Sequence, residues 1–169
     1  MSSSPDFILG VDPGLGGGFG LYCVGQVGAS FVQDMPLVHG KLAPNLVAEL
    51  VNATAQNCRG RLVAAVENVH SRPRQAGAFN FGLSTGIIHG VLAANGIPIT
   101  LISPSVWKVK MGLQRNQDEP QSATKDRARE LAAKLFPNLA DQFKRKKDDG
   151  RAEALLLAVY YHHTLTGGK

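Results

Sequence analysis

Cysteine is scarce in this sequence, since only Cys23 and Cys58 occur among its 169 residues. Two isolated cysteines supply neither a disulfide framework nor the paired spacing of a zinc site. We therefore predict two free thiols in a reducing compartment, which excludes the small disulfide-rich secreted proteins. The sequence also lacks a cationic, apolar leader, so we expect no secretory signal.

Charged side chains are absent from one long stretch of the chain. No Asp, Glu, Lys or Arg occurs between Arg74 and Lys108, a run of 33 residues. A membrane span takes about 20 apolar residues, but Asn80, His89 and Pro98 interrupt this run. We predict a buried helix followed by a buried strand, and no membrane as a partner.

The length and composition are those of an ordinary globular protein. With 44% hydrophobic and 18% charged residues, the chain is long enough for one full hydrophobic core. We predict a disordered N-terminal tail over residues 1–6 and a single domain over residues 7–165.

Positive charge is concentrated in the C-terminal part. The formal net charge is +5, and residues 107–151 hold 12 Lys or Arg against 7 Asp or Glu. The whole excess therefore lies in this segment. A basic surface of this kind suits a polyanionic partner.

Short apolar runs and helical stripes alternate along the chain. The first part predicts three antiparallel strands, followed by a helix with an apolar stripe. The later alternation of strand and helix predicts a mixed α/β sheet with helices on its faces. The predicted strands cover residues 7–11, 18–24, 29–35, 62–66 and 97–102, and the predicted helices end near residues 56, 95, 135 and 163.

Three carboxylates stand in apolar surroundings. Asp12 ends the first strand, Glu67 ends the strand LVAAV, and Glu153 lies inside the apolar helix. A buried ionised carboxylate is costly unless it is paired, hydrogen-bonded or bound to a metal. Acids converging from separate elements offer the oxygen ligands that Mg²⁺ and Mn²⁺ prefer. Together with the glycines after Asp12, which allow close approach of a phosphate backbone, they point to metal-dependent phosphodiester chemistry.

Two adjacent acids precede Glu153 in the last predicted helix. Asp149 is four residues away, so a helix would place it about 40° from Glu153 on the same face. Asp148 is five residues away, about 140° round the helix if both are helical. Asp148 can join Glu153 only if it precedes the helix, and Gly150 is compatible with such a late start. The geometry leaves both acids open.

Four segments in this order carry a resemblance to a known family. They are ILGVDPGLGG, VENVH, FNFGLSTGIIHGVLAANGIPITLISPSVWK and KRKKDDGRAEALLLA. Together they resemble the RuvC-like Holliday junction resolvases, and most of all the chloroplast-type branch with its bacterial and phage relatives. The resemblance implies a ribonuclease H-like α/β fold, a five-stranded mixed sheet flanked by helices. It also implies a homodimer that nicks two opposing strands of a four-way DNA junction with divalent metal, leaving 5′-phosphate ends.

The resemblance also implies roles for individual residues. Lys108 matches a lysine beside the scissile phosphate, where an ammonium stabilises charge on phosphoryl oxygens. Asp149 stands where the pattern K-K-D-H-G-R-A-E-A has His, so it is an alternative third metal ligand to Asp148. The implied ligands of two Mg²⁺ or Mn²⁺ ions in each active site are Asp12, Glu67, Asp148 and Glu153.

Basic and aromatic residues near these motifs are candidates for DNA binding. The run Lys144–Lys147 directly precedes Asp148, which favours phosphate contacts. Phe79 and Phe81 either stack on bases of the junction or pack in the core. The predicted DNA-binding residues are Arg72, Arg74, Phe79, Phe81, Lys144, Arg145, Lys146 and Lys147.

Three glycines recur every four residues in the predicted uncharged helix. Gly82, Gly86 and Gly90 would form a bare stripe, although each costs about 0.8–1 kcal/mol against alanine in a helix. Two explanations fit this stripe equally well. One is close packing within the chain, and the other is close approach by DNA or by a second subunit.

Two other functions also fit part of the sequence. An actin-like or sugar-kinase-type ATPase likewise begins with a strand, D-x-G and a glycine turn, but this chain is too short for two lobes and we expect no nucleotide cofactor. A junction-binding protein without catalysis would not require the acids. Because the expected substrate is DNA, we expect the protein in the cytoplasm, with the nucleoid of a bacterium or phage-infected cell. Location in an organelle is the alternative.

Overall fold

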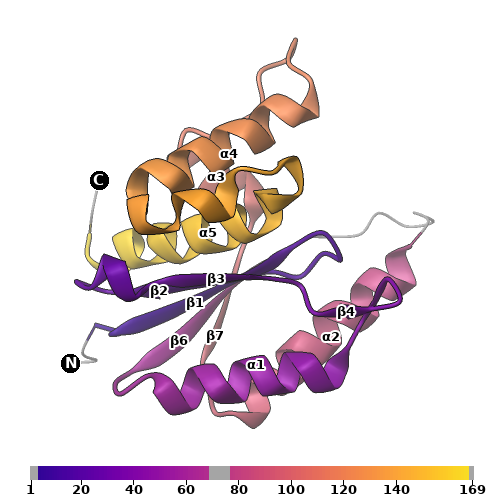
Figure 1. Cartoon of the computed structure of the whole chain (residues 1–169), viewed down its shortest axis with the longest axis vertical. Helices are drawn as coiled ribbons and strands as arrows, with labels where there is room; N and C mark the ends of the chain where they lie inside the picture. Colours follow the sequence, from indigo (N-terminus) through magenta and orange to yellow (C-terminus); the bar gives the residue numbers. More distant parts are fainter. Residues whose placement is uncertain (1–3, 69–76, 168–169) are drawn as a thin grey trace.

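Five strands form one mixed sheet in the computed structural model, which describes residues 4–68 and 77–167 (Figure 1). The strand order is β3-β2-β1-β6-β7. The first three strands are antiparallel neighbours, whereas β6 and β7 run parallel to β1. The bounds are β1 Phe7–Asp12, β2 Gly18–Cys23, β3 Phe31–Asp34, β6 Leu62–Glu67 and β7 Ile99–Ile102.

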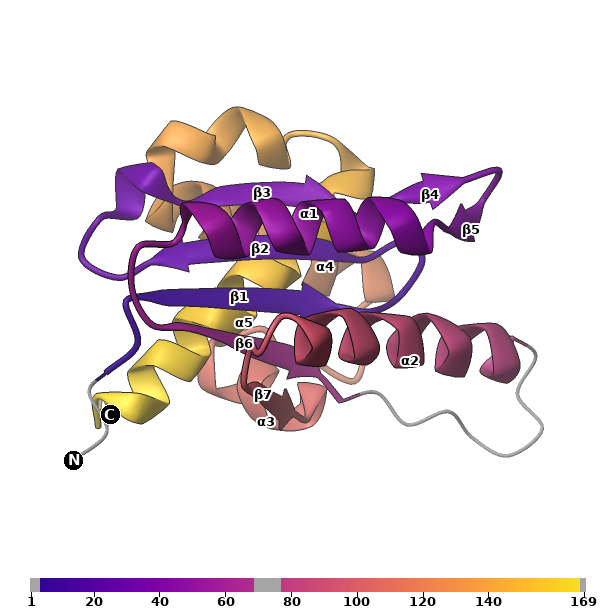
Figure 2. The same cartoon turned by 90° about the horizontal axis from the view of Figure 1, so that it is seen from below.

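Helices cover both faces of this sheet (Figures 1 and 2). On one face lie α1 (Pro44–Asn57) and α2 (Ala78–Ala94). On the other lie α3 (Pro104–Lys110), α4 (Gln121–Leu135) and α5 (Asp149–Leu165).

The alternation of side chains along β1 divides the core into two layers. Ile8 packs with α4 and α5, while Leu9 and Val11 pack with α1 and α2. All three side chains are completely buried, as expected for a central strand covered on both faces.

Helix α5 lies directly on the backbone of the two central strands. A Cβ atom at Gly10 would come within 1.8 Å of the Ala154 carbonyl oxygen, and one at Gly20 within 2.5 Å of the Leu155 Cα. Only glycine fits at such an approach. These glycines therefore bring α5 close to the sheet, and Gly10 and its partner Ala65 lie two residues before the ends of β1 and β6.

Most of the fold agrees with the sequence prediction. The five strands, the antiparallel order of the first three, the mixed sheet and the major helices are confirmed, with boundary shifts of a few residues. A small hairpin, β4 (Leu37–Val38) with β5 (Lys41–Leu42), is an addition that the sequence pattern does not predict. Its strands have only two residues each, too few for an alternating pattern. Its tight turn depends on positive φ values at His39 (51°) and Gly40 (73°).

The predicted N-terminal tail is only partly covered by the structure. Residues 1–3 lie outside the described residues. Pro5 is buried, and the Asp6 carboxylate accepts a hydrogen bond of 2.8 Å from the backbone N–H of Arg61. Within residues 4–68 and 77–167, no helix has the length and apolar character needed to cross a membrane.

Candidate active site

Three carboxylates meet at the carboxyl ends of β1 and β6. Asp12, Glu67 and Glu153 each offer an oxygen, and these oxygens all lie within 4.8 Å of one another. The parallel register pairs Val11 with Val66, so Asp12 and Glu67 follow at the same edge of the sheet. Helix α5 crosses above them and supplies Glu153. The three acids singled out from the sequence are therefore neighbours in space.

Lys108 on α3 places its ammonium between two of these acids. Its Nζ atom donates a 2.6 Å hydrogen bond to Glu153 Oε2 and lies 3.8 Å from Glu67 Oε1. The preceding Trp107 is completely buried, and its indole Nε1 donates a 3.0 Å hydrogen bond to Glu67 Oε1. Trp107 is thus a core residue that also orients one carboxylate.

Asp12 and Glu67 hold their protons more tightly than free carboxyl side chains do. Burial, reinforced by neighbouring carboxylates, raises the pKa of Asp12 to about 6 and that of Glu67 to about 7. Burial works against the charged form of Lys108, but Glu153 and Glu67 outweigh it and raise the pKa of Lys108 above its usual value. Additional positive charge would therefore stabilise the ionised carboxylates of the cluster.

Asp149 faces the same cavity, which has a volume of about 700 Å³. Its lining includes Asp12, Lys108 and Glu153, and the negative charge of Asp149 contributes to the raised pKa of Asp12. The Asp149 carboxylate forms an ion pair with Lys125 from the first turns of α4. Sequence reasoning missed Lys125, because it looks like one more charge on the polar face of an amphipathic helix.

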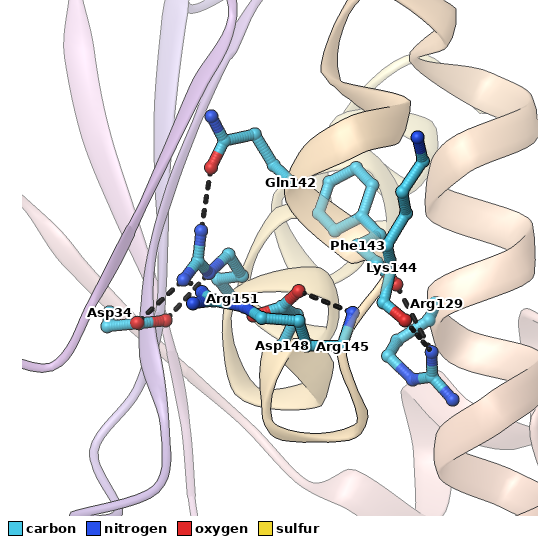
Figure 3. A network of polar contacts seen from close by, with 8 residues as sticks. All are labelled: Asp34, Arg129, Gln142, Phe143, Lys144, Arg145, Asp148 and Arg151. Atoms are coloured by element: carbon cyan, nitrogen blue, oxygen red, sulfur yellow. Dashed lines mark hydrogen bonds and ion pairs between the residues drawn. The ribbon is translucent and has the colours of Figure 1, made fainter.

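Asp148 is not brought to the acidic cluster. Its carboxylate is 1% exposed and points to Arg145, accepting bonds from the backbone N–H at 2.8 Å, from Nε at 3.0 Å and from Nη2 at 2.8 Å (Figure 3). Burial alone would raise the pKa of Asp148, but the bonds from Arg145 outweigh it and lower that pKa.

The backbone explains why the two neighbouring acids differ. Asp148 ends the short 3-10 helix Lys146–Asp148 and stands at the N-cap position of α5, but its side chain bonds back to Arg145 and makes no capping bond to α5. Asp149 is the first residue of α5 and shares a helix face with Glu153, four residues later. The sequence resemblance predicts Asp148 as the third ligand, with Asp149 as the alternative. In the structure it is Asp149 that faces the cluster.

The predicted DNA-binding residues are spread over several surfaces. Lys144 pairs with Asp141 at the surface, Lys146 is exposed, and Lys147 lines a small cavity beside Gly16 and Gly17. Phe79 is 81% exposed at the start of α2, whereas Phe81 is half-buried. Arg72 and Arg74 lie outside the described residues.

The glycine stripe on α2 faces outward. At Gly82, Gly86 and Gly90, no described atom would lie within 4 Å of an added Cβ. The described part of the chain therefore does not use this stripe for close packing.

The donor set of the cluster fits a hard divalent cation. Carboxylate oxygens from β1, β6 and α5 converge, and the described site offers no thiol or imidazole beside them. Mg²⁺ and Mn²⁺ favour such oxygen ligands. A bound cation would also offset the charge repulsion that raises the pKa values of Asp12 and Glu67.

No protein family model and no curated protein sequence matches this chain. Its structure is nevertheless similar to a solved structure of T. thermophilus RuvC in complex with a Holliday junction substrate. That match has a TM-score of 0.60 and 16% identity, and it covers 96% of this chain and 97% of the other. A second structure of Thermus thermophilus RuvC gives a TM-score of 0.60 and 18% identity at the same coverage. The predicted fold is therefore confirmed, a ribonuclease H-like five-stranded mixed sheet flanked by helices.

Proposed function

We propose that this protein is a structure-selective endonuclease, a Holliday junction resolvase that makes symmetric, metal-dependent nicks in four-way DNA junctions. The observation that carries the proposal is the convergence of Asp12, Glu67 and Glu153 within 4.8 Å. The fold shared with a protein solved on a Holliday junction substrate supports the choice of DNA.

Four carboxylates are proposed to hold two Mg²⁺ or Mn²⁺ ions. They are Asp12, Glu67, Asp149 and Glu153, with Asp149 taking the place that the sequence resemblance gave to Asp148. When bound, the ions would supply Lewis-acid stabilisation of the phosphoryl oxygens and an activated water. The expected products are 5′-phosphate and 3′-hydroxyl ends.

Two lysines are proposed to act on the scissile phosphate itself. Lys108 and Lys125 enter the same cavity from α3 and α4, and each is paired with a carboxylate of the site. A bound cation would compete with the two ammonium groups for those carboxylates, and Lys108 and Lys125 would then be available to bind phosphoryl oxygens. Charge developing on these oxygens in the transition state is stabilised by such donors. The aliphatic side chains of Val109 and Leu113 line the same cavity.

The surrounding surface is proposed to hold the junction. Lys146 and Lys147 provide phosphate contacts beside the cluster, and the exposed Phe79 ring stacks on a base. Arg72, Arg74, Phe81, Lys144 and Arg145 stay in the predicted DNA-binding set.

Two symmetric nicks call for two active sites related by a two-fold axis, so we propose a homodimer. The open glycine face of α2 leaves room for backbone approach by DNA or by the second subunit. The proposed setting is the nucleoid of a bacterium or phage-infected cell, with an organelle as the other compartment that holds such DNA.

Cleavage of synthetic DNA tests this function. With Mn²⁺ or Mg²⁺ the purified protein should nick four-way junctions at symmetric positions and should leave linear duplexes of the same sequence intact. Cleavage should stop when EDTA is added. Ligase should reseal the products, because it needs 5′-phosphate and 3′-hydroxyl ends. Uncut junctions together with tight ATP binding in calorimetry would favour the ATPase alternative. Junction binding without cutting would favour the non-catalytic one.

A further inference from the structure

Arg151 on α5 is the centre of a polar network beside the active site. Its side chain is 8% exposed. The guanidinium donates to both carboxylate oxygens of Asp34 at 2.6 Å, to Gln142 Oε1 at 2.7 Å, and lies 3.4 Å from Asp148 Oδ1 (Figure 3). The Arg151 side chain thus links α5 to strand β3, to the 3-10 helix Pro137–Phe143 and to Asp148, the residue just before α5.

The strand register places the Arg151–Asp34 ion pair in the same row of the sheet as Asp12. Asp12 on β1 pairs with Gly18 on β2, and Gly18 pairs with Asp34 on β3. The three residues therefore form one row across the sheet. By binding Asp34, Arg151 anchors α5 to the row that carries Asp12.

In the sequence of α5, Arg151 is midway between the two acids that this helix supplies. It is two residues after Asp149 and two before Glu153. The backbone of this turn is also close to the sheet. A Cβ at Gly18 would lie 3.2 Å from the Arg151 Cα, and one at Gly150 would lie 2.1 Å from the Gly16 carbonyl oxygen. These backbone contacts set the distance between α5 and the sheet. The bidentate pair between Arg151 and Asp34 sets the orientation of the helix.

We propose that Arg151 is a positioning residue that sets the place of Asp149 and Glu153 relative to Asp12, so that metal affinity depends on its bidentate pair with Asp34. This rests on the proposed metal-dependent function. Mg²⁺ and similar ions demand near-ideal ligand geometry, and functional sites tolerate displacements of only about 0.5 Å. A lysine keeps the charge of Arg151 but not its two-pronged geometry.

Mn²⁺ binding without DNA tests this proposal directly. In the full-length Arg151→Lys protein, titration of free Mn²⁺ by electron paramagnetic resonance should give an affinity about 10- to 100-fold weaker than wild type. Junction cutting should need correspondingly more Mn²⁺ and should recover at saturation, a split that general destabilisation does not produce. Arg127→Lys is the control for loss of another arginine–carboxylate pair, in which Nη1 of Arg127 donates to both oxygens of Glu119 at 2.8 and 2.9 Å. It should leave Mn²⁺ affinity unchanged.

A second variant covers the possibility that Arg151→Lys does not fold. Asp34→Asn removes the partner carboxylate while Arg151 keeps Gln142, and it should weaken Mn²⁺ binding in the same direction. Mn²⁺ affinity within twofold of wild type in a folded variant overturns the positioning role. So does loss of folding in both variants, since the pair would then be needed for the fold as a whole. Failure of wild type to bind Mn²⁺ would instead refute the proposed metal centre.

Discussion

Two groups of acids lie side by side at the start of α5, and they differ in their partners. Asp12, Glu67 and Glu153 face the ammonium of Lys108, whereas Asp34 and Asp148 face the guanidinium groups of two arginines. A bidentate arginine satisfies both oxygens of a carboxylate. A single ammonium shared among several acids leaves oxygens available for another cation.

The same contrast appears in the proton affinities. Burial and mutual repulsion raise the pKa of Asp12 and Glu67, while the bonds from Arg145 overcome burial and lower the pKa of Asp148. Burial of an acid therefore does not identify a metal ligand. What separates a ligand from a structural anchor is whether protein donors already complete its coordination.

Asp12→Asn should show the largest effect on activity. Loss of a metal ligand removes several kcal/mol of transition-state stabilisation, which corresponds to a rate decrease of about a thousandfold or more. Junction affinity, measured by gel shift, should stay close to wild type. Asp6→Asn, just before the other end of β1, is the control and should cut normally. Undiminished cutting by Asp12→Asn would remove it from the metal site.

Lys108→Gln should slow single-turnover cutting by about a hundredfold, because one donor to the phosphoryl oxygens is lost. Lys110→Gln is the matched control, since Lys110 is exposed two residues later on the same helix. Equal rates for the two variants would show that Lys108 balances charge in the cluster without acting on the phosphate.

Mn²⁺ affinity should fall by about tenfold or more between pH 8 and pH 6, because protons compete for the ligands. Glu67, with a pKa of about 7, accounts for most of this change, and Asp12, with a pKa of about 6, adds to it. Asp148 stays ionised over this range, since its pKa is lowered. Paramagnetic resonance titrations at pH 6, 7 and 8 measure the effect. A flat profile would contradict the raised pKa values.

Neutralising the two kinds of acid should change stability in opposite directions. A pKa that is raised on folding means that the ionised Asp12 disfavours the native state. This cost is present above pH 6 and disappears below the unfolded pKa of about 4. In EDTA at pH 8, Asp12→Asn should therefore raise the free energy of unfolding by on the order of 1 kcal/mol. Asp148→Asn should lower it by about 1–3 kcal/mol, because it leaves buried donors without a partner. Urea unfolding checks both signs.

Much of the fold was accessible from the sequence, because its signals are local. Asp12 and Glu67 each follow an apolar strand, and Glu153 stands out in an apolar helix, so each could be recognised without knowing its neighbours. Their proximity followed from the parallel pairing of the two strands.

The remaining features depend on tertiary contacts. Whether Asp148 or Asp149 faces the cluster is decided by where α5 begins and by the bonds to Arg145. Lys125 becomes part of the site only because α4 packs beside α5. Gly10 and Gly20 have no local signature of their role, since what they accommodate is a helix more than 130 residues later in the chain.

Asp149 is proposed to bind metal, whereas Asp148 is proposed to hold Arg145 in place before α5. Single-turnover cutting of a synthetic four-way junction by Asp149→Asn and Asp148→Asn, at saturating Mn²⁺ and a temperature where both are folded, tests this distinction most directly. We predict a loss of about a hundredfold or more for Asp149→Asn and a rate within about tenfold of wild type for Asp148→Asn. The reverse order, or a wild type that leaves the junction uncut, would contradict the account.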